Sequence, residues 1–241
     1  MMMMSLDGVK ALTFDVFGTV VDWRSSIARE AEALLAPKGH DLDWSAFADA
    51  WRARYQPAME QVRSGARPFT KLDVLHRENL EGVLQSFDVC GLSEKELDHL
   101  NRAWHRLTPW PDAVEGLMRL KGKYVLATQS NGNVALMVNM AKNAGLPWDV
   151  ILGAEVCQAY KPMPEAYRRA ADLLGLRPEE CMMTAAHNDD LKAAAACGFK
   201  TAFVARPGEK GPNQTIDLEA APGMDVAATS FIDLADKLGC A

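Results

Sequence analysis

The sequence lacks the cysteine pattern of a disulfide-stabilised protein. Its five cysteines are odd in number and show no paired spacing: Cys90, Cys157, Cys181, Cys197 and Cys240. Such cysteines are typical of proteins that stay reduced inside a cell. We therefore expect free, structural thiols and a cytoplasmic location.

Long apolar runs and basic clusters are missing as well. No stretch reaches the roughly 20 apolar residues that a membrane span requires, and residues 1–4 lack the charged start and apolar run of a signal peptide. The formal net charge is −6, which argues against a nucleic-acid partner because phosphate backbones attract basic surfaces. An anionic substrate must then be attracted by local cations.

The sequence does contain alternating strand and helix patterns, interrupted once. Strands are predicted at residues 9–14, 124–128, 150–152, 181–185 and 201–204. Helices are predicted at 113–120 and 134–144, from near Pro164, and at 191–197, whereas 207–215 is predicted to be a polar loop. The interruption is entirely helical, with predicted helices from about residue 23 to 35 and at 44–62, 69–84 and 93–107.

Polar groups follow the predicted strands. Asp15 ends the first strand and is followed by Gly18 and Thr19, an arrangement that suits a positioned nucleophile or, alternatively, a turn-capping aspartate. After the second predicted strand, the hydroxyl of Ser130, the amide of Asn131 and nearby backbone N–H groups make a natural anion cradle.

Two further segments follow the same rule. Lys161 precedes a proline and hence a rigid turn, and residues 181–190 form an apolar strand followed by His187, Asn188 and two aspartates. The four segments together, in this order, resemble the haloacid dehalogenase superfamily of hydrolases over nearly the whole chain. That resemblance implies Asp15 as a nucleophile on phosphate esters or carbon–halogen bonds.

The resemblance also implies the fold. We expect an α/β protein with a doubly wound, Rossmann-like parallel sheet core and an inserted α-helical cap domain. The core is expected at residues 1–21 and 109–241 and the cap at 22–108. The Pro-Trp-Pro run at 109–111 suits the extended return to the core.

Two positions distinguish the branches of the superfamily. Its phosphatases carry a second aspartate two residues after the nucleophile, where this chain has Phe17, and another aspartate four residues before Asp190, where it has Ala186. The first protonates the leaving group and the second helps to bind Mg²⁺, which needs oxygen ligands. We therefore expect no metal and no cofactor.

A halide leaves without a proton or a metal. The pattern is similar to that of the type II (S)-2-haloacid dehalogenases, in which an aromatic residue occupies the place of Phe17 and a cap-helix arginine meets the halide. Arg52, in a Trp-Arg pair, matches that arginine; Arg54 is the competing candidate, and a solvated helix charge is the alternative for Arg52. Tyr167 matches a pocket tyrosine of the family.

The expected mechanism has two steps. Asp15, held by Thr19 and kept ionised by Lys161, attacks the halogen-bearing carbon while Arg52 meets the halide. The substrate carboxylate lies against Ser130, Asn131 and nearby N–H groups. Asp190 then activates water onto the acyl carbon of the ester, so that configuration inverts at a chiral carbon.

The last motif departs from the family pattern of Ser-Ser-Asn-x-aromatic-Asp. His187 stands at the place of the asparagine and Asp189 at that of the aromatic ring, unless a one-residue shift aligns Asn188 instead. Either the loop is repacked with Asp189 in solvent, or His187 joins Arg52 in a polar halide site that favours fluoride.

Two other functions stay open at this point. One is a magnesium-dependent phosphatase of small phosphate esters, and the other is a non-catalytic binding protein on the same fold. The partner expected from the sequence is a small 2-haloacid, and a homodimer is possible. Three cap aromatics are expected mainly to pack between helices: Trp51, Tyr55 and Phe69.

Overall fold

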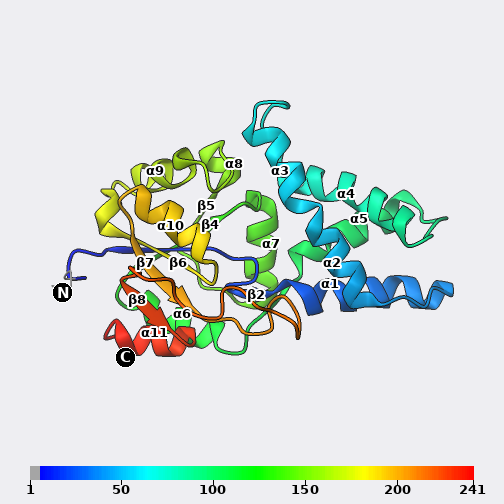
Figure 1. Ribbon diagram of the computed structural model, residues 1–241. Helices are drawn as coiled ribbons and strands as arrows, with labels where there is room; N and C mark the ends of the chain where they lie inside the picture. Colours follow the sequence, from blue (N-terminus) through cyan, green and yellow to red (C-terminus); the bar gives the residue numbers. More distant parts are fainter. Residues whose placement is uncertain (1–5) are drawn as a thin grey trace.

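A six-stranded parallel sheet forms the centre of the molecule (Figure 1). The computed structural model describes residues 6–241, so the expectation about residues 1–4 lies outside the described residues. The spatial order is β5 (Val150–Gly153), β4 (Val125–Ser130), β1 (Ala11–Phe14), β6 (Cys181–Ala185), β7 (Lys200–Val204) and β8 (Val226–Ala228). Every pair of neighbouring strands is parallel, which confirms the expected fold class.

Strand β1 lies inside the sheet, and all four of its residues are buried. It pairs with β4 on one side and β6 on the other. A central parallel strand is covered on both faces, which explains the nearly continuous apolar run in the sequence. The Phe14 ring contacts Trp148 and Phe231 on one face of the sheet.

Helices cover both faces of the sheet. Figure 1 shows α8 (Ala154–Cys157), α9 (Pro164–Leu173) and α10 (Asn188–Ala196) above it, and α6 (Ala113–Lys121) and α11 (Phe231–Lys237) below it. Helix α7 (Val134–Ala144) packs against β5, and the short 3₁₀ turn η3 (Pro178–Glu180) precedes β6. The connections from β1 and β6 run in opposite directions, and such a switch opens a crevice at the carboxyl ends of the strands.

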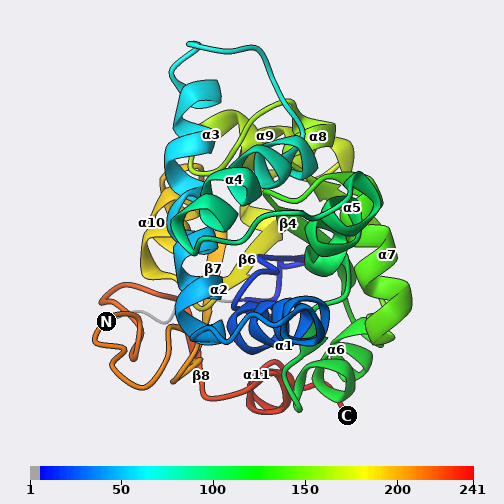
Figure 2. The ribbon, with the colours of Figure 1, turned by 90° about the vertical axis from the view of Figure 1, so that its right-hand side faces the viewer.

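The inserted segment is helical and lies to the right in Figure 1 and toward the viewer in Figure 2. Its helices are α1 (Trp23–Leu35), α2 (Trp44–Ala53), α3 (Tyr55–Arg63), α4 (Leu72–Ser86) and α5 (Glu94–Asn101), with 3₁₀ turns η1 (Ala36–Lys38) and η2 (Arg102–His105). The side chains of Asp22 and Asp43 cap α1 and α2. A capping box between Ser93 and Glu96 begins α5.

Two short antiparallel strands join the segments that lead out of the core and back into it. They are β2 (Val21–Asp22) and β3 (Thr108–Pro109), in which Val21 pairs with Pro109. We propose this pair as the boundary between a core domain of residues 1–21 and 109–241 and a cap domain of residues 22–108.

The two largest differences from the predicted helices are in the cap. The helix predicted at 44–62 is broken at Arg54 into α2 and α3, because Pro57 has no N–H and in a continuous helix its ring would meet the carbonyl of Ala53. The helix predicted at 93–107 ends at Asn101 and continues as the 3₁₀ turn η2. Strand β8 and helix α11 were not predicted.

The thiols and the helix lengths bear on two expectations from the sequence. All five cysteines are free, and of these only Cys90 is exposed. Among residues 6–241, no helix is long and apolar enough to cross a membrane.

Candidate active site

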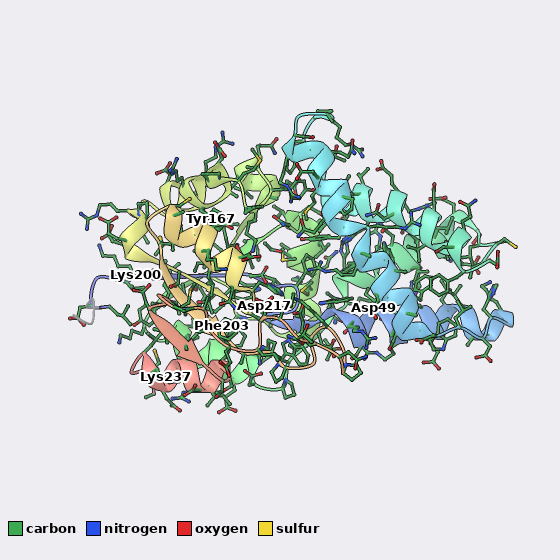
Figure 3. All side chains as sticks on the ribbon, in the orientation of Figure 1. Asp49, Tyr167, Lys200, Phe203, Asp217 and Lys237 are labelled. Carbon is green, nitrogen blue, oxygen red and sulfur yellow. The ribbon has the colours of Figure 1, made fainter. Side chains whose placement is uncertain are left out.

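A cavity of about 710 Å³ lies between the carboxyl ends of the strands and the cap helices. The segment between β7 and β8 borders it too, and Figure 3 shows Asp217 of this segment on the side of the core that faces Asp49 of α2. Residues from the core, the cap and that segment line the cavity, among them Asp15, Trp23, Arg52, Tyr55, Arg63, Asn131, Lys161, Tyr167, His187, Asp190, Glu209 and Asp217.

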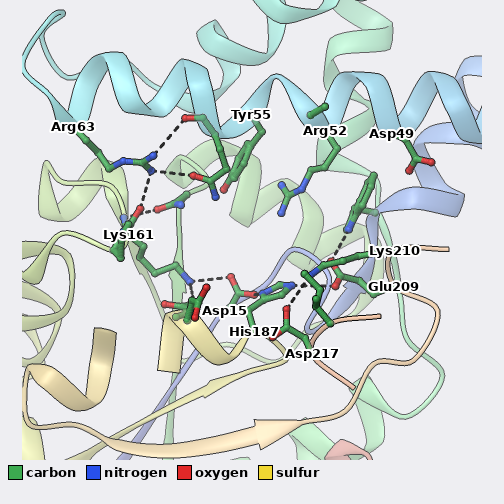
Figure 4. A pocket seen from close by; sticks show the side chains of 18 of the residues that line it. Asp15, Asp49, Arg52, Tyr55, Arg63, Lys161, His187, Glu209, Lys210 and Asp217 are labelled. Atoms are coloured by element: carbon green, nitrogen blue, oxygen red, sulfur yellow. Dashed lines mark hydrogen bonds and ion pairs between the residues drawn. The ribbon is translucent and has the colours of Figure 1, made fainter. Parts of the chain in front are cut away.

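Asp15 follows β1 directly, and its carboxylate is held from three directions. Figure 4 shows it with Lys161 and His187. Its Oδ1 accepts a hydrogen bond from Lys161 Nζ at 2.9 Å. Its Oδ2 accepts from Thr19 Oγ1 at 2.7 Å and contacts His187 Nδ1 at 3.0 Å. Burial raises the pKa of Asp15, but the Lys161 charge and the His187 hydrogen bond outweigh it and lower that pKa, so the carboxylate is ionised at neutral pH.

Lys161 joins Asp15 to Asp190. Its ammonium also donates to Asp190 Oδ2 in a short hydrogen bond, and the Tyr167 hydroxyl donates to the other oxygen of Asp190 at 2.6 Å. Burial lowers the pKa of Lys161, yet the two carboxylates raise it on balance. The pKa of Asp190 is raised by burial, with the nearby Asp15 charge acting in the same direction against Lys161 and Tyr167.

His187 lies between two carboxylates. Its Nδ1 faces Asp15, and its Nε2 lies 3.1 Å from Oε2 of Glu209. Burial lowers the pKa of His187, but the hydrogen bonds with Asp15 and Glu209 prevail and raise it to about 10. The imidazole is therefore a cation that donates from both nitrogens at neutral pH.

Glu209 is almost fully buried, at 2% exposure, although it belongs to the predicted polar loop at 207–215. Its Oε1 accepts from the Trp23 indole at 2.9 Å. Room for it comes from Gly18, where a Cβ would lie 2.1 Å from that same oxygen. Burial raises the pKa of Glu209, but the His187 hydrogen bond and charge lower it on balance, so Glu209 is a buried anion.

Arg52 faces the cavity from α2 (Figure 4), and aromatic rings surround its guanidinium. The guanidinium carbon lies 4.1 Å from the ring centroid of Tyr55, 5.3 Å from that of Trp23 and 5.8 Å from that of Phe17. Its Nη1 is buried and has no hydrogen-bond partner among the described residues. Arg54 instead donates to the carbonyl of Gly82, so of the two candidate arginines the structure places Arg52 at the cavity.

The expected anion cradle is only partly open to the cavity. Asn131 lines it, and its Oδ1 accepts from the Lys161 backbone N–H at 2.8 Å. Ser130 is buried beneath, and its hydroxyl accepts from the Gly132 N–H at 3.1 Å. Phe17 is also buried, edge-on to Tyr55 and Trp104, and supports the Arg52 enclosure from behind.

The loop after β6 resolves the open register, because His187 and not Asn188 reaches Asp15. The Asn188 side chain, expected to contact substrate, bonds Asp217 and the backbone of Glu219 and Ala221, which anchors the segment before β8. Asp189 extends into solvent beside Lys192.

His187 lies on the Asp15 side of the cavity, because its Nδ1 is 3.0 Å from Oδ2 of Asp15.

The phosphatase positions do not form a magnesium site. The Lys161 ammonium already balances both Asp15 and Asp190, and the side chains of Phe17 and Ala186 have no ligand atom. Within residues 6–241 no group of three or more His, Cys, Asp or Glu side chains is arranged to hold a metal ion. A hard cation needs several oxygen ligands, and the side chains at these positions do not supply them.

Some residues of the site were not predicted. No sequence pattern marks Glu209 as a site residue, because a single glutamate in a Pro-Gly segment is usually solvated. Trp23 has the pattern of an ordinary helix-packing residue. Arg63 of α3, which donates to the Lys161 carbonyl at 3.1 Å, has the same sequence context as any charge near a helix end.

An aspartate at the end of the central strand, a lysine bridging it to a second aspartate, and helices over a doubly wound sheet define a capped α/β protein with an ionised carboxylate in its cavity. The model of the haloacid dehalogenase-like hydrolase family matches residues 9–198. The chain belongs to the haloacid dehalogenase-like hydrolase family.

Individual relatives agree with this assignment. The chain is 31% identical over 209 residues to (S)-2-haloacid dehalogenase 4A of Burkholderia cepacia, an alignment that covers 84% of this chain and 86% of the relative. A solved defluorinating L-2-haloacid dehalogenase is similar with a TM-score of 0.94 and 52% identity, covering 96% of each chain. A second solved L-2-haloacid dehalogenase has a TM-score of 0.92 and 48% identity over 96% of this chain and 99% of that one.

Proposed function

We propose that the chain converts short (S)-2-haloalkanoic acids, haloacetates included, to 2-hydroxy acids through an ester on Asp15 and without a metal ion. Its similarity to named (S)-2- and L-2-haloacid dehalogenases over most of its length makes it a carbon–halide hydrolase. The observation that carries the finer proposal is the unpartnered Arg52 nitrogen, enclosed by aromatic rings in the same cavity as the ionised Asp15.

In the first step, an oxygen of Asp15 attacks the halogen-bearing carbon and the halide departs with the bonding electrons. Lys161 keeps Asp15 ionised, and the cap excludes water from the carboxylate. Arg52 receives the halide, because a guanidinium N–H without a partner gains most when a negative charge develops beside it. The substrate carboxylate lies near Asn131 and the backbone N–H groups after β4, with Ser130 beneath.

In the second step, water attacks the acyl carbon of the ester. Asp190 takes a proton from that water and passes it to the departing alkoxide, and the raised pKa of Asp190, a result of burial, suits this exchange. The bond broken is on the enzyme side of the ester oxygen. The configuration therefore inverts once, and (S)-2-chloropropionate should give (R)-lactate.

Fluoroacetate belongs among the proposed substrates. Fluoride is small and strongly hydrated, so its departure depends more on hydrogen-bond donors than that of chloride or bromide. The relative with 52% identity is named as defluorinating. The vacant donor on Arg52 supports the same activity in this chain.

A single turnover in ¹⁸O-labelled water tests the ester directly. With enzyme in excess over substrate, the label should enter the carboxylate of Asp15 and not the product, because the product takes its oxygen from Asp15. A parallel reaction in unlabelled water provides the control. Label in the product hydroxyl on the first turnover would refute the proposal.

A second assay separates the other functions. The enzyme is offered chloroacetate and a generic phosphate ester, each with and without chelator. We expect chelator-independent halide release and no phosphate release. Phosphate release restored by Mg²⁺ would indicate the phosphatase, and inactivity on both would indicate a binding protein.

A further inference from the structure

The two oxygens of Asp15 have different surroundings. Oδ1 has one partner, Lys161 Nζ at 2.9 Å, whereas Oδ2 has two, the Thr19 hydroxyl at 2.7 Å and His187 Nδ1 at 3.0 Å. The Thr19 oxygen itself accepts from the Ala186 N–H at 2.9 Å, which directs the hydroxyl proton of Thr19 toward Asp15. Oδ1 keeps more free electron density for attack, and Oδ2 is the oxygen that becomes the ester carbonyl.

Two donors that converge on a carbonyl oxygen are the defining geometry of an oxyanion hole. Hydrolysis of the Asp15 ester places a full negative charge on that oxygen in the tetrahedral intermediate. No other residue described at the site is hydrogen-bonded to Oδ2.

Glu209 fixes the second donor. Its carboxylate is buried, tied to the Trp23 indole and pressed against Gly18, so the His187 ring is held by Nε2 while Nδ1 points at Asp15. The other charged groups around the ring are Lys161 beyond Asp15, Arg52 near Glu209, and Asp217, which is paired with Lys210.

We propose that protonated His187, together with Thr19, forms an oxyanion hole for hydrolysis of the Asp15 ester, and that Glu209 is the positioning residue that keeps His187 oriented and charged. This inference rests on the proposed aspartyl ester. It gives His187 a role in the second chemical step, on the nucleophile side of the substrate.

Hydrolysis of the Asp15 ester needs only water and the groups of the site. The oxygen of water bonds to Cγ of Asp15, and the carbonyl π pair moves onto Oδ2, where His187 and Thr19 donate to it. The pair then returns and the Cγ–Oδ1 bond breaks, so that the alcohol leaves with Oδ1. One water proton passes through Asp190 to that alcohol, and the other is released when Asp15 ionises again.

Rapid-quench single turnover with chloroacetate, read by intact-protein mass spectrometry, tests the role of His187. We expect His187→Ala to form the alkylated enzyme at nearly the normal rate and to hydrolyse it about 10²-fold more slowly, the usual effect of losing one oxyanion donor. The matched control is His99→Ala, since His99 is exposed on α5 and has no role in the site.

The other outcomes are separable. Slower ester formation with normal hydrolysis, or no change in either, would overturn the oxyanion role while the ester mechanism stands. Halide release without any alkylated protein in the unaltered enzyme would overturn the ester mechanism itself, and the inference with it.

Glu209→Gln tests the positioning residue with a side chain of nearly the same size. Without the buried carboxylate, the pKa of His187 falls. As the pH is raised, His187 therefore loses its proton, and with it the charged donor, at a lower pH than in the unaltered enzyme. The alkaline fall in the ester-hydrolysis rate should therefore move to lower pH, with a nearly normal rate below the fall. A uniform loss at every pH, or an unshifted profile, would show a structural role only and refute the proposal.

Discussion

The floor and the roof of the cavity differ in how their charges are balanced. The floor is the core side, formed by Asp15, Lys161, Asp190 and His187, and every one of these groups has an oppositely charged partner. The roof is the cap side, where Arg52 stands among aromatic rings with one nitrogen unpartnered.

The difference follows from when each group is needed. A nucleophile and its supports must be in place before the substrate arrives, since reorganising buried charges during the reaction is costly. A donor for the leaving group is most useful if its partner appears only as the bond breaks. The floor is therefore complete in itself, and the substrate completes the roof.

Removing the lysine of the floor should have the largest effect. In Lys161→Ala, the carboxylates of Asp15 and Asp190 face each other without a cation, which raises the pKa of the nucleophile. We expect kcat/KM on chloroacetate to fall by about 10³-fold or more, as halide release would show, since the residue acts on both carboxylates.

Lys192→Ala provides the control, because Lys192 pairs with solvent-exposed Asp189 on the outside of α10. Circular dichroism and thermal unfolding must show that Lys161→Ala is folded. A folded Lys161→Ala enzyme with nearly full activity would contradict the account of the floor.

Changing the roof should have a smaller effect. Arg52→Ala removes the proposed halide donor but leaves the proposed nucleophile intact, so we expect kcat to fall by about 10²-fold. Arg54→Ala, two residues away with its guanidinium on the Gly82 carbonyl, should retain most of the activity. A greater loss in Arg54→Ala than in Arg52→Ala would reverse our assignment of the halide site.

The identity of the halide sharpens the comparison further. Bromide leaves most easily, so an enzyme without a specific donor should prefer bromoacetate strongly. We expect the vacant Arg52 nitrogen to reduce the differences in kcat/KM among fluoro-, chloro- and bromoacetate and to permit fluoride release. Undetectable fluoride release, together with a much higher kcat/KM on bromoacetate than on chloroacetate, would show that the roof does not stabilise the departing fluoride.

Metal removal should have no effect. Exhaustive EDTA treatment is expected to leave dehalogenation unchanged, because Lys161 supplies the positive charge on the floor. Phe17→Asp should not create a phosphatase, since Ala186 still offers no ligand. Loss of activity in EDTA with recovery on adding Mg²⁺ would favour the phosphatase instead.

Sequence reasoning located three groups at the carboxyl edge of the sheet. Asp15 follows β1 directly, Lys161 lies in the segment after α8, and Asp190 is in the first turn of α10 after β6. Parallel strands bring their carboxyl ends to one edge of the sheet. The same topology predicted the α/β core. The helical cap was also predicted from periodicity. The break at Arg54 was missed, because periodicity alone does not register the effect of Pro57.

Glu209 shows what sequence reasoning could not reach. Its burial depends on the absence of a side chain at Gly18, an indole on α1 and an imidazole after β6, three contacts that are distant in the sequence. Nothing local distinguishes it from a solvated loop glutamate. The direction of the His187 ring could not be predicted for the same reason, because Glu209 holds its Nε2.

The fit of Glu209 against Gly18 also constrains how descendants of this sequence can vary. Gly18 has a φ of 85°, and any side chain there would overlap the Glu209 carboxylate. A Cβ at position 18 would displace that carboxylate from its contact with the Trp23 indole, so positions 18 and 209 cannot change independently. Even with a shorter side chain at position 209, a residue other than glycine would strain this turn, so one backbone angle after β1 limits which charge the distant loop can carry.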